Sequence, residues 1–307
     1  MLEELKEEKY MHQFLQQALL GAKGDGSGQS ISQINSVAGG CIHKAWRLTL
    51  SDGRQLFAKT AAVEDFPKLS FEASGLNSLA KFANKHTIEI PKPLLLKKFE
   101  NGSVLFLPWL DLGNGSQTAI GKGLALLHQS SLAQHPEKFG WEEHGYIGAG
   151  PQIGGWKDSW GECFINLRLL PQLKIARKWG LNISDWKDLL ESLIVFLERH
   201  KPKPTLVHGD LWSGNAGITK EGKAVIFDPA VWWADREVDI AMTRLFGGFS
   251  KDFYKGYESI FPLESTAESR VDIYNLYHLL NHANIFGGAY KVQCLTTLEN
   301  IKRNILY

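Results

Sequence analysis

Two polar side chains in the segment LVHGDLWSGN, residues 206–215, have the types and the spacing that phosphoryl transfer needs. Asp210 and Asn215 stand five residues apart, directly after the strand-like pair Leu206 and Val207. Transfer of a phosphoryl group from a nucleotide requires a carboxylate that orients the acceptor hydroxyl, and hard oxygen ligands that hold magnesium against the phosphates. The spacing Asp-x-x-x-x-Asn therefore predicts Asp210 as the catalytic base and Asn215 as a magnesium ligand.

The residues that follow predict a hairpin that returns a second carboxylate to the same place. The stretches AGIT at 216–219 and AVIFD at 224–228 have the composition of strands, and Lys220-Glu221-Gly222 suits the turn between them. Such a hairpin places Asp228 beside Asn215, so that both side chains can share one ion. HGD alone occurs by chance in many sequences, whereas HGD, the asparagine, the hairpin and FDPA together are hard to obtain by accident.

Two upstream features predict a grip on the nucleotide. Gly39, Gly40 and Cys41 fall between two expected strands, where glycine lets backbone N–H groups approach phosphate oxygens. Lys59 ends the apolar strand QLFAKT, and Glu72 follows 13 residues later on a helical stretch, as in a phosphate-binding lysine oriented by a glutamate. Gly-Gly alone is usually a turn and each charge alone is usually solvated, but their order along the chain favours a nucleotide site.

Hydrophobic periodicity predicts the elements that position these residues. Helices are expected at 3–20, 68–83, 119–130 and 186–197, and strands within 30–60 and at 103–110. Pro108 and Gly113 to Gly115 suit a linker. We therefore expect an α+β protein with a small antiparallel-sheet lobe at 1–107, a connector at 108–115 and a larger, mainly helical lobe at 116–307.

Composition excludes several classes of partner. Of 307 residues, 44% are apolar, and 34 basic side chains almost balance 33 acidic ones, so no global field attracts nucleic acid or an acidic membrane. Cys41, Cys163 and Cys294 are too few and too scattered for a disulfide framework or a zinc site. No apolar run approaches the roughly 20 residues that cross a bilayer, and the acidic N-terminus lacks the features of a signal peptide. We expect a cytoplasmic protein without nucleic-acid or membrane partners.

These motifs resemble the protein-kinase-like fold in its aminoglycoside-phosphotransferase branch, and more closely the fructosamine/ketosamine-3-kinase family. The resemblance covers nearly the whole chain, from VAGGCIHKAWRL and LFAKT to FDPAVWWADREVDIAM, and HGDLWSGN and REVDIAM are its most specific parts. It implies a bilobal fold and an enzyme that uses ATP and Mg²⁺. The roles that it implies are the base for Asp210, magnesium ligands for Asn215 and Asp228, a phosphate-gripping pair for Lys59 and Glu72, and an adenine-contacting hinge for Pro108, Trp109 and Leu110.

The family resemblance also implies a reaction and a substrate, which spacing and composition do not. It implies ATP-dependent phosphorylation of the 3-hydroxyl of ketoamine adducts, such as fructosamines or ribulosamines of lysine or other amines. The phosphorylated ketoamine is unstable and sheds its sugar, so the activity amounts to deglycation. Whether the amine is free or protein-bound, and which sugar is preferred, stays open.

Two other functions are compatible with the same motifs. One is a kinase for another small hydroxyl metabolite, such as a sugar, a choline-like or an aminoglycoside-like acceptor, although the mixed charges of residues 240–307 argue against a polycation. The other is a nucleotide-binding pseudokinase scaffold, which the presence of all five motif residues disfavours. Gly209 stands where an arginine would read an activating phosphate, and only about eleven residues separate Asp228 from Asp239. Regulation by phosphorylation of that segment is therefore not expected.

Several further residues have two interpretations. Trp212 can stack on a sugar or aliphatic adduct, and His282 can line the acceptor pocket. The other tryptophans, among them Trp156, Trp160 and Trp186, are expected in the core. His208 and Asp239 are expected to act structurally, the latter as a brace for the catalytic loop through backbone hydrogen bonds. Cys41, beside phosphate-binding N–H groups, is a candidate for redox sensitivity, so that the chain is either a monomer or a redox-sensitive dimer.

Overall fold

A computed structural model describes residues 2–20, 28–37, 43–182 and 186–306. The chain divides into two compact units. Unit 1 consists of Met1–Ser78 and Pro91–Asp111, and unit 2 of Leu79–Ile90 and Leu112–Tyr307. The boundaries that we expected around a connector at 108–115 stay a prediction. None of the described helices is long and apolar enough to cross a membrane.

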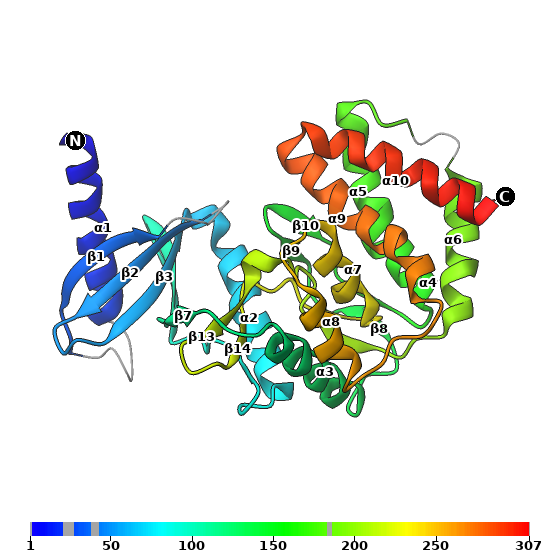
Figure 1. Cartoon of the computed structure of the whole chain (residues 1–307). Coiled ribbons are helices and arrows are strands. Elements are labelled where there is room, and N and C mark those ends of the chain that lie inside the picture. Colours follow the sequence, from blue (N-terminus) through cyan, green and yellow to red (C-terminus); the bar gives the residue numbers. More distant parts are fainter. Residues whose placement is uncertain (1, 21–27, 38–42, 183–185, 307) are drawn as a thin grey trace. The chain divides into compact units, whose positions relative to one another are not determined.

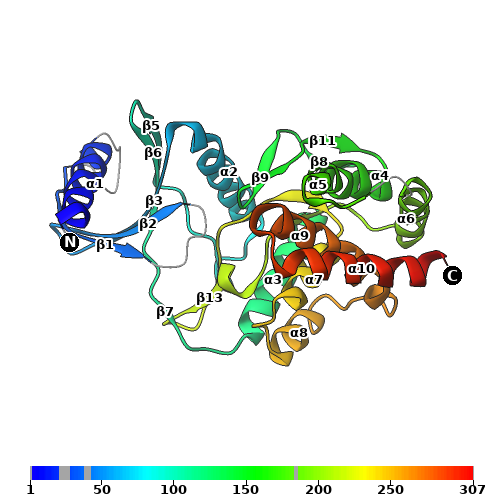
Figure 2. The same cartoon turned by 90° about the horizontal axis from the view of Figure 1, so that it is seen from above.

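Unit 1 is built on a five-stranded antiparallel sheet with the order β1-β2-β3-β6-β5, whose strands are labelled in Figures 1 and 2. The strands are β1 Ile31–Val37, β2 Lys44–Leu50, β3 Gln55–Ala61, β5 Leu95–Phe99 and β6 Gly102–Pro108. Helix α1 Leu2–Leu20 precedes the sheet, and α2 Phe66–Phe82 follows β3. The antiparallel sheet and both helices confirm the architecture that periodicity predicts for this part of the chain.

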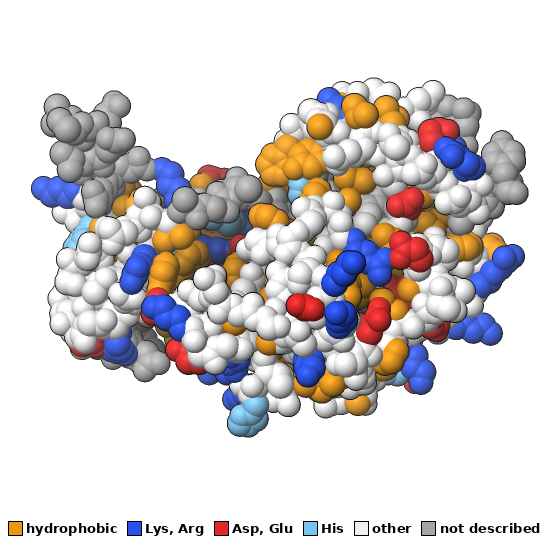
Figure 3. All heavy atoms as spheres, in the orientation of Figure 1, with side chains coloured by type: hydrophobic (Ala, Val, Ile, Leu, Met, Phe, Trp, Pro, Cys, Tyr) orange, Lys and Arg blue, Asp and Glu red, His pale blue; other side chains and the backbone are white. Residues whose placement is uncertain are grey.

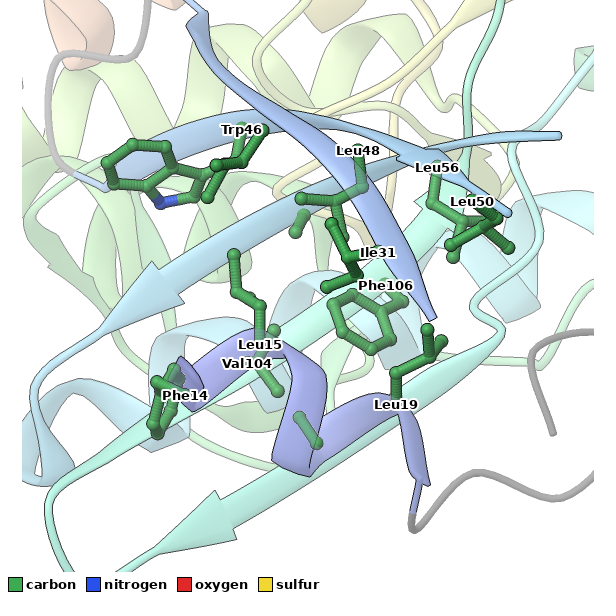
Figure 4. Packing of buried hydrophobic residues seen from close by; sticks show 13 residues of the cluster. Phe14, Leu15, Leu19, Ile31, Trp46, Leu48, Leu50, Leu56, Val104 and Phe106 are labelled. Carbon is green, nitrogen blue, oxygen red and sulfur yellow. The ribbon is translucent and has the colours of Figure 1, made fainter. Parts of the chain in front are cut away.

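The core of unit 1 lies between α1 and one face of the sheet (Figure 4). Phe14, Leu15 and Leu19 from α1 pack against strand residues that include Ala58 of β3. Because successive side chains of a strand point to opposite faces, Lys59 faces away from this core. The helix thus supports the strand that carries the candidate phosphate-binding lysine, from the other side of the sheet.

Unit 2 is mainly helical. Its helices are α3 Thr118–Leu132, α4 Trp160–Phe164, α5 Leu170–Ala176, α6 Lys187–His200, α7 Glu237–Leu245, α8 Lys251–Glu258, α9 Val271–Phe286 and α10 Ala289–Leu306, with a π-helical turn at Ile165–Leu169. Helix α9 packs against α7, α5 and α10, and Figure 2 shows α9 and α10 side by side. The predicted helices at 119–130 and 186–197 are confirmed.

Short strands of unit 2 hold the segments that carry the candidate site. One sheet has the order β11-β8-β15-β12 and the other β4-β14-β13-β7. Their bounds are β4 Ile88–Glu89, β7 Leu112–Gly113, β8 Phe139–Trp141, β11 Gly155–Lys157, β12 Thr205–Val207, β13 Ala216–Thr219, β14 Ala224–Ile226 and β15 Trp232–Ala234, and a separate hairpin joins β9 Gly145–Ile147 to β10 Gly150–Gln152. The predicted hairpin at 216–228 is confirmed, with Ala216 opposite Ile226.

Within residues 108–115, β7 forms the edge of its sheet, and its Gly113 pairs with Ile218 of β13. One expectation about the fold is wrong. Trp156 was expected in the core but is 39% exposed, whereas Trp160 and Trp186 are buried. Trp156 lies on β11, the edge strand of its sheet, where one set of alternating side chains faces solvent.

Candidate active site

The loop after β12 ties its two candidate catalytic residues together. The backbone N–H of Trp212 donates to the carbonyl of Asp210 at 3.1 Å, and the N–H of Asn215 donates to the carbonyl of Trp212 at 2.9 Å. The side-chain Nδ2 of Asn215 also donates to the carbonyl of Asp210, at 2.9 Å. Because its NH₂ group faces the loop, the Oδ1 atom of Asn215 is left as a ligand for a cation.

Asp228 follows directly on the second strand of the hairpin. The N–H of Phe227 donates to the carbonyl of Asn215 at 3.0 Å, so Asp228 is one residue beyond the point of contact. Its φ angle of 58° lies in the left-handed region, which costs a non-glycine residue on the order of 1–3 kcal/mol. Such a conformation persists only where neighbouring contacts over-determine it.

His208 supplies two of those contacts. Its Nε2 donates to the carbonyl of Phe227 at 2.8 Å, and its own carbonyl accepts from the N–H of Ala230, also at 2.8 Å. Burial lowers the pKa of His208, although the charge of Asp239 acts in the opposite direction. A buried histidine whose ring bonds to Phe227 and whose backbone carbonyl bonds to Ala230, on either side of Asp228, fits the structural role that we expected for His208.

Through its side chain, Gln152 fixes the backbone that follows Asp228. Its Nε2 donates to the carbonyls of Ala230 and Val231, at 3.2 Å each, and its Oε1 accepts from the hydroxyl of Tyr277 at 3.2 Å. Gln152 is only 2% exposed. Gln152 of β10, itself bonded to Tyr277 of α9, therefore holds the backbone that continues from Asp228. No local sequence pattern indicates this contact.

Asp239 at the start of α7 braces the catalytic loop. Its Oδ2 accepts from the N–H of His208 at 2.7 Å, and its Oδ1 from the N–H of Gly209 at 2.8 Å, as we expected. Nε2 of His128 lies 3.2 Å from Oδ2, and Nδ1 of His128 lies 2.8 Å from the hydroxyl of Tyr257. Burial raises the pKa of Asp239, but its contacts with His128 and the loop outweigh burial and hold that pKa below its usual range.

The environment of Asp210 suits a general base. Among the described residues, its Oδ1 atom is buried and has no hydrogen-bond partner. Burial, together with the negative charges of Asp228 and Asp239, raises the pKa of Asp210 to about 7. A carboxyl group with a pKa near neutrality accepts a proton far more readily than an ordinary aspartate does.

Lys59 and Glu72 form a buried ion pair in unit 1. Nζ of Lys59 lies 2.8 Å from Oε1 of Glu72, and each side chain is 10% exposed. The pair joins β3 to α2, as the resemblance implied. Burial of two opposite charges at this distance orients the ammonium group, because displacing it would leave a carboxylate without its partner in a poorly hydrated place.

The other candidates for nucleotide contact are the expected hinge residues and the Gly-Gly-Cys segment. Pro108 ends β6, and Trp109 follows with its indole beside the guanidinium of Arg47, at 4.6 Å from ring centroid to Cζ. Leu110 is the next residue and is partly buried. Gly39, Gly40 and Cys41 lie outside the described residues.

The two candidate acceptor residues both belong to unit 2. The indole of Trp212 packs over Gly214, where an added Cβ would lie 2.2 Å from Cη2 of the ring. Nδ1 of His282 lies 2.9 Å from the carbonyl of His278 and donates to it, and its ring centroid is 4.6 Å from that of Phe246. Contact of Trp212 and His282 with an acceptor stays a prediction.

The fold and the site together define a phosphotransferase with a protein-kinase-like fold. The fructosamine kinase family model matches residues 12–304, and the chain belongs to this family. A Synechocystis protein assigned as a ketoamine kinase is 41% identical over 89% of this chain and 91% of its own length. The chloroplastic protein-ribulosamine 3-kinase of Arabidopsis thaliana is 33% identical over 91% of this chain and 85% of its own length.

Solved structures agree with this family and fold. A Haemophilus somnus protein assigned as a fructosamine-3-kinase superposes with a TM-score of 0.83 at 28% identity, covering 94% of this chain and 96% of its own. An amicoumacin kinase in complex with AMP-PNP superposes with a TM-score of 0.57 at 15% identity, over 99% and 96% of the two chains. The second likeness concerns the fold alone.

Proposed function

We propose that the protein is an ATP-dependent kinase that phosphorylates the 3-hydroxyl of ketoamine adducts and thereby starts their deglycation. The observation that carries the kinase assignment is the hairpin that ties Asp210, Asn215 and Asp228 into one hydrogen-bonded segment. The substrate class rests on the relatives, which are named for ketoamines and for protein-bound ribulosamine. Phosphorylation of a ketoamine agrees both with the arrangement of this segment and with the names of the relatives.

The residues present fit a nucleotide with a magnesium ion. Oδ1 of Asn215 and the carboxylate of Asp228 are hard oxygen ligands of the kind that Mg²⁺ prefers. When bound, the ion would neutralise charge on the phosphates during transfer. Lys59, oriented by Glu72, would bind nucleotide phosphate through its ammonium group. The hinge role of Pro108, Trp109 and Leu110, and the phosphate contacts of Gly39, Gly40 and Cys41, belong to this proposal.

Asp210 would act on the acceptor. Its carboxylate orients the 3-hydroxyl and takes its proton as the hydroxyl oxygen forms a bond to the γ-phosphorus. The bond between the γ-phosphorus and the oxygen that bridges to the β-phosphate breaks, and ADP leaves with that electron pair. The raised pKa of Asp210 supports this role, because the carboxylate must accept a proton at neutral pH.

The acceptor is a small-molecule or protein-bound ketoamine. Trp212 in the catalytic loop and His282 on α9 are the side chains that we assign to the acceptor pocket. A cytoplasmic location stays our prediction for this protein. The Arabidopsis relative is instead named as chloroplastic. A monomer or a Cys41-linked dimer is likewise a prediction.

The test is release of ADP from Mg-ATP with defined acceptors. Fructose-lysine and ribulose-lysine should support turnover, whereas free fructose, choline and an aminoglycoside should not, and phosphorus NMR should place the phosphate on O3. An Asp210→Asn variant serves as the blank for contaminating kinases. Saturable ATP binding without turnover of any acceptor would instead favour the scaffold, and turnover of choline or a free sugar alone would favour another metabolite kinase.

A further inference from the structure

Four aromatic rings gather where α7, α9 and α10 meet, and we call them the aromatic shelf. Its members are Phe246, His282, Phe286 and Tyr290. The ring centroid of His282 lies 4.6 Å from that of Phe246, 5.2 Å from that of Tyr290 and 5.8 Å from that of Phe286. Phe286 and Tyr290 are 6.2 Å apart. These spacings are those of interacting aromatic pairs, so the four side chains form one surface.

The shelf is open to solvent on one side. Phe286 is 50% exposed, and the other three members are partly exposed. Figure 3 shows hydrophobic side chains and a histidine gathered over the junction of α9 and α10. Aromatic rings that interact with one another and still face water offer a ready contact surface for an apolar or planar group.

The shelf continues into the catalytic loop. Gly247 and Gly248 follow Phe246 with φ angles of 72° and 88°, and the backbone of Gly248 lies directly against the side chain of Ser213. An added Cβ at Gly248 would come within 2.2 Å of Oγ of Ser213. Nε2 of Gln117 donates to the carbonyl of Gly248 at 2.8 Å and anchors this turn. Ser213 is the neighbour of Trp212, so the turn that follows Phe246 lies against the loop that carries this candidate acceptor residue.

The chemistry of the shelf suits an uncharged group. Burial lowers the pKa of His282, and because Nδ1 donates to the carbonyl of His278, its Nε2 is an acceptor. None of the four shelf side chains is a carboxylate, a lysine or an arginine. An apolar chain or a flat ring therefore fits the shelf better than a strongly charged ligand does.

We propose that the aromatic shelf binds the substituent on the amine nitrogen of the ketoamine and favours apolar or aromatic substituents. The inference rests on the proposed function, because it takes the sugar end of the acceptor to lie at Asp210. With the sugar at that position, the amine-borne chain must leave the catalytic loop, and the shelf offers it an apolar surface that approaches this loop through Gly248 and Ser213.

The experiment keeps the sugar constant and varies the amine. Fructose adducts of methylamine and of benzylamine are compared as acceptors, and the selectivity is the ratio of their kcat/KM values. Wild type should prefer the benzylamine adduct, and Phe286→Ser and Tyr290→Ser should lower the ratio about three- to tenfold, the range that aromatic pairing provides. The methylamine adduct should react equally well in all variants, because it does not reach the shelf.

Leu295→Ser is the matched control, since Leu295 on α10 is also 50% exposed but belongs to no ring contact among the described residues. Its selectivity should equal that of wild type. Phe286→Leu keeps apolar bulk without the ring and should lose part of the preference even if a serine variant folds poorly. Unchanged selectivity in every shelf variant overturns the proposal. Failure of wild type to phosphorylate either adduct would contradict the proposed function instead, so the two failures are distinct.

Discussion

Nδ2 of Asn215 donates a hydrogen bond of 2.9 Å to the backbone carbonyl of Asp210, so the proposed metal ligand and the proposed base are fixed to one another by the loop that carries both. The acceptor of this hydrogen bond is the main-chain carbonyl of Asp210, so the carboxylate of Asp210 takes no part in it. Replacement of the Asp210 side chain should therefore remove one chemical group without unfolding the loop.

Asp210→Ala should lower kcat about 10²- to 10⁴-fold, the usual contribution of a positioned general base. Affinity for the nucleotide should stay nearly unchanged, because the variant does not touch Lys59, Asn215 or Asp228. Steady-state kinetics and calorimetric titration with AMP-PNP measure the two quantities. A variant that keeps near-wild-type kcat would show that Asp210 is not the base.

Glu72→Gln should raise the KM for ATP about tenfold or more, because Lys59 loses the charge that orients its ammonium group. The matched control is Lys68→Gln, which disrupts the more exposed pair between Lys68 and Asp65. Exposed pairs contribute about 0–1 kcal/mol, so this control should bind ATP as wild type does. Equal KM values for the two variants would argue against the phosphate-gripping pair.

Gln152→Leu should raise the magnesium concentration needed for half-maximal activity about tenfold, because the carbonyls of Ala230 and Val231 lose their donor and the backbone at Asp228 relaxes. Gln172→Leu is the control, since Gln172 is equally buried but donates to Pro151 and Asn281 instead. Mn²⁺ binding in the presence of AMP-PNP, followed by electron paramagnetic resonance, tests the same change without catalysis. If both variants need the same magnesium as wild type, Gln152 serves stability alone.

His200 predicts a pH-dependent contribution to stability. Its Nε2 lies 3.1 Å from Oδ2 of Asp235 and 3.5 Å from Oε1 of Glu237, and its Nδ1 lies 3.0 Å from Oε2 of Glu264. Arg270 pairs with Glu237 in the same cluster, and the hydroxyl of Tyr274 donates to Asp235. Burial lowers the pKa of His200, but Asp235 and Glu237 outweigh burial and raise it above 6.5.

A raised pKa in the folded state stabilises the protein below the unfolded pKa of 6.5, and this contribution is lost as the pH rises through the folded value. His200→Gln should therefore lower the free energy of unfolding by about 1–3 kcal/mol near pH 6 and by less near pH 9. Urea unfolding at both pH values measures the difference. A destabilisation that is the same at both would mean that the charge of His200 plays no part.

Two of the three thiols should be inert in the folded protein. Cys163 and Cys294 are fully buried, and burial raises the pKa of each to about 12. A thiol reagent such as DTNB should therefore modify neither under native conditions, and any rapid reaction or response to dithiothreitol should disappear in Cys41→Ser. Native labelling that persists in Cys41→Ser would contradict this expectation.

Much of the local structure around the candidate site could be predicted because its signals lie within short stretches of sequence. The Asp210 loop, the hairpin to Asp228 and the strand that carries Lys59 all have local signals in apolar alternation, turn residues and motif spacing. The hairpin register brings Ala216 opposite Ile226, which is what places Asp228 next to Asn215. Local patterns suffice where a single turn fixes the geometry.

The parts that escaped prediction depend on contacts between distant segments. His128 bonds to Asp239 from 111 residues away, and Gln152 meets Tyr277 across 125 residues. Periodicity identifies the helices that carry such side chains but does not say which helix faces which. Trp156 was misjudged for the same reason, because its exposure depends on the place of β11 at a sheet edge and not on its own sequence.

The close approach of Gly209 to Ala230 also limits how this enzyme can be controlled. Gly209 has a φ angle of 82°, and any Cβ there would lie 2.1 Å from the carbonyl oxygen of Ala230. No arginine can occupy that position without displacing the backbone that leads away from Asp228, so the residue with which many signalling kinases sense their own phosphorylation is sterically barred. Regulation that depends on an arginine at this position is therefore closed to this chain.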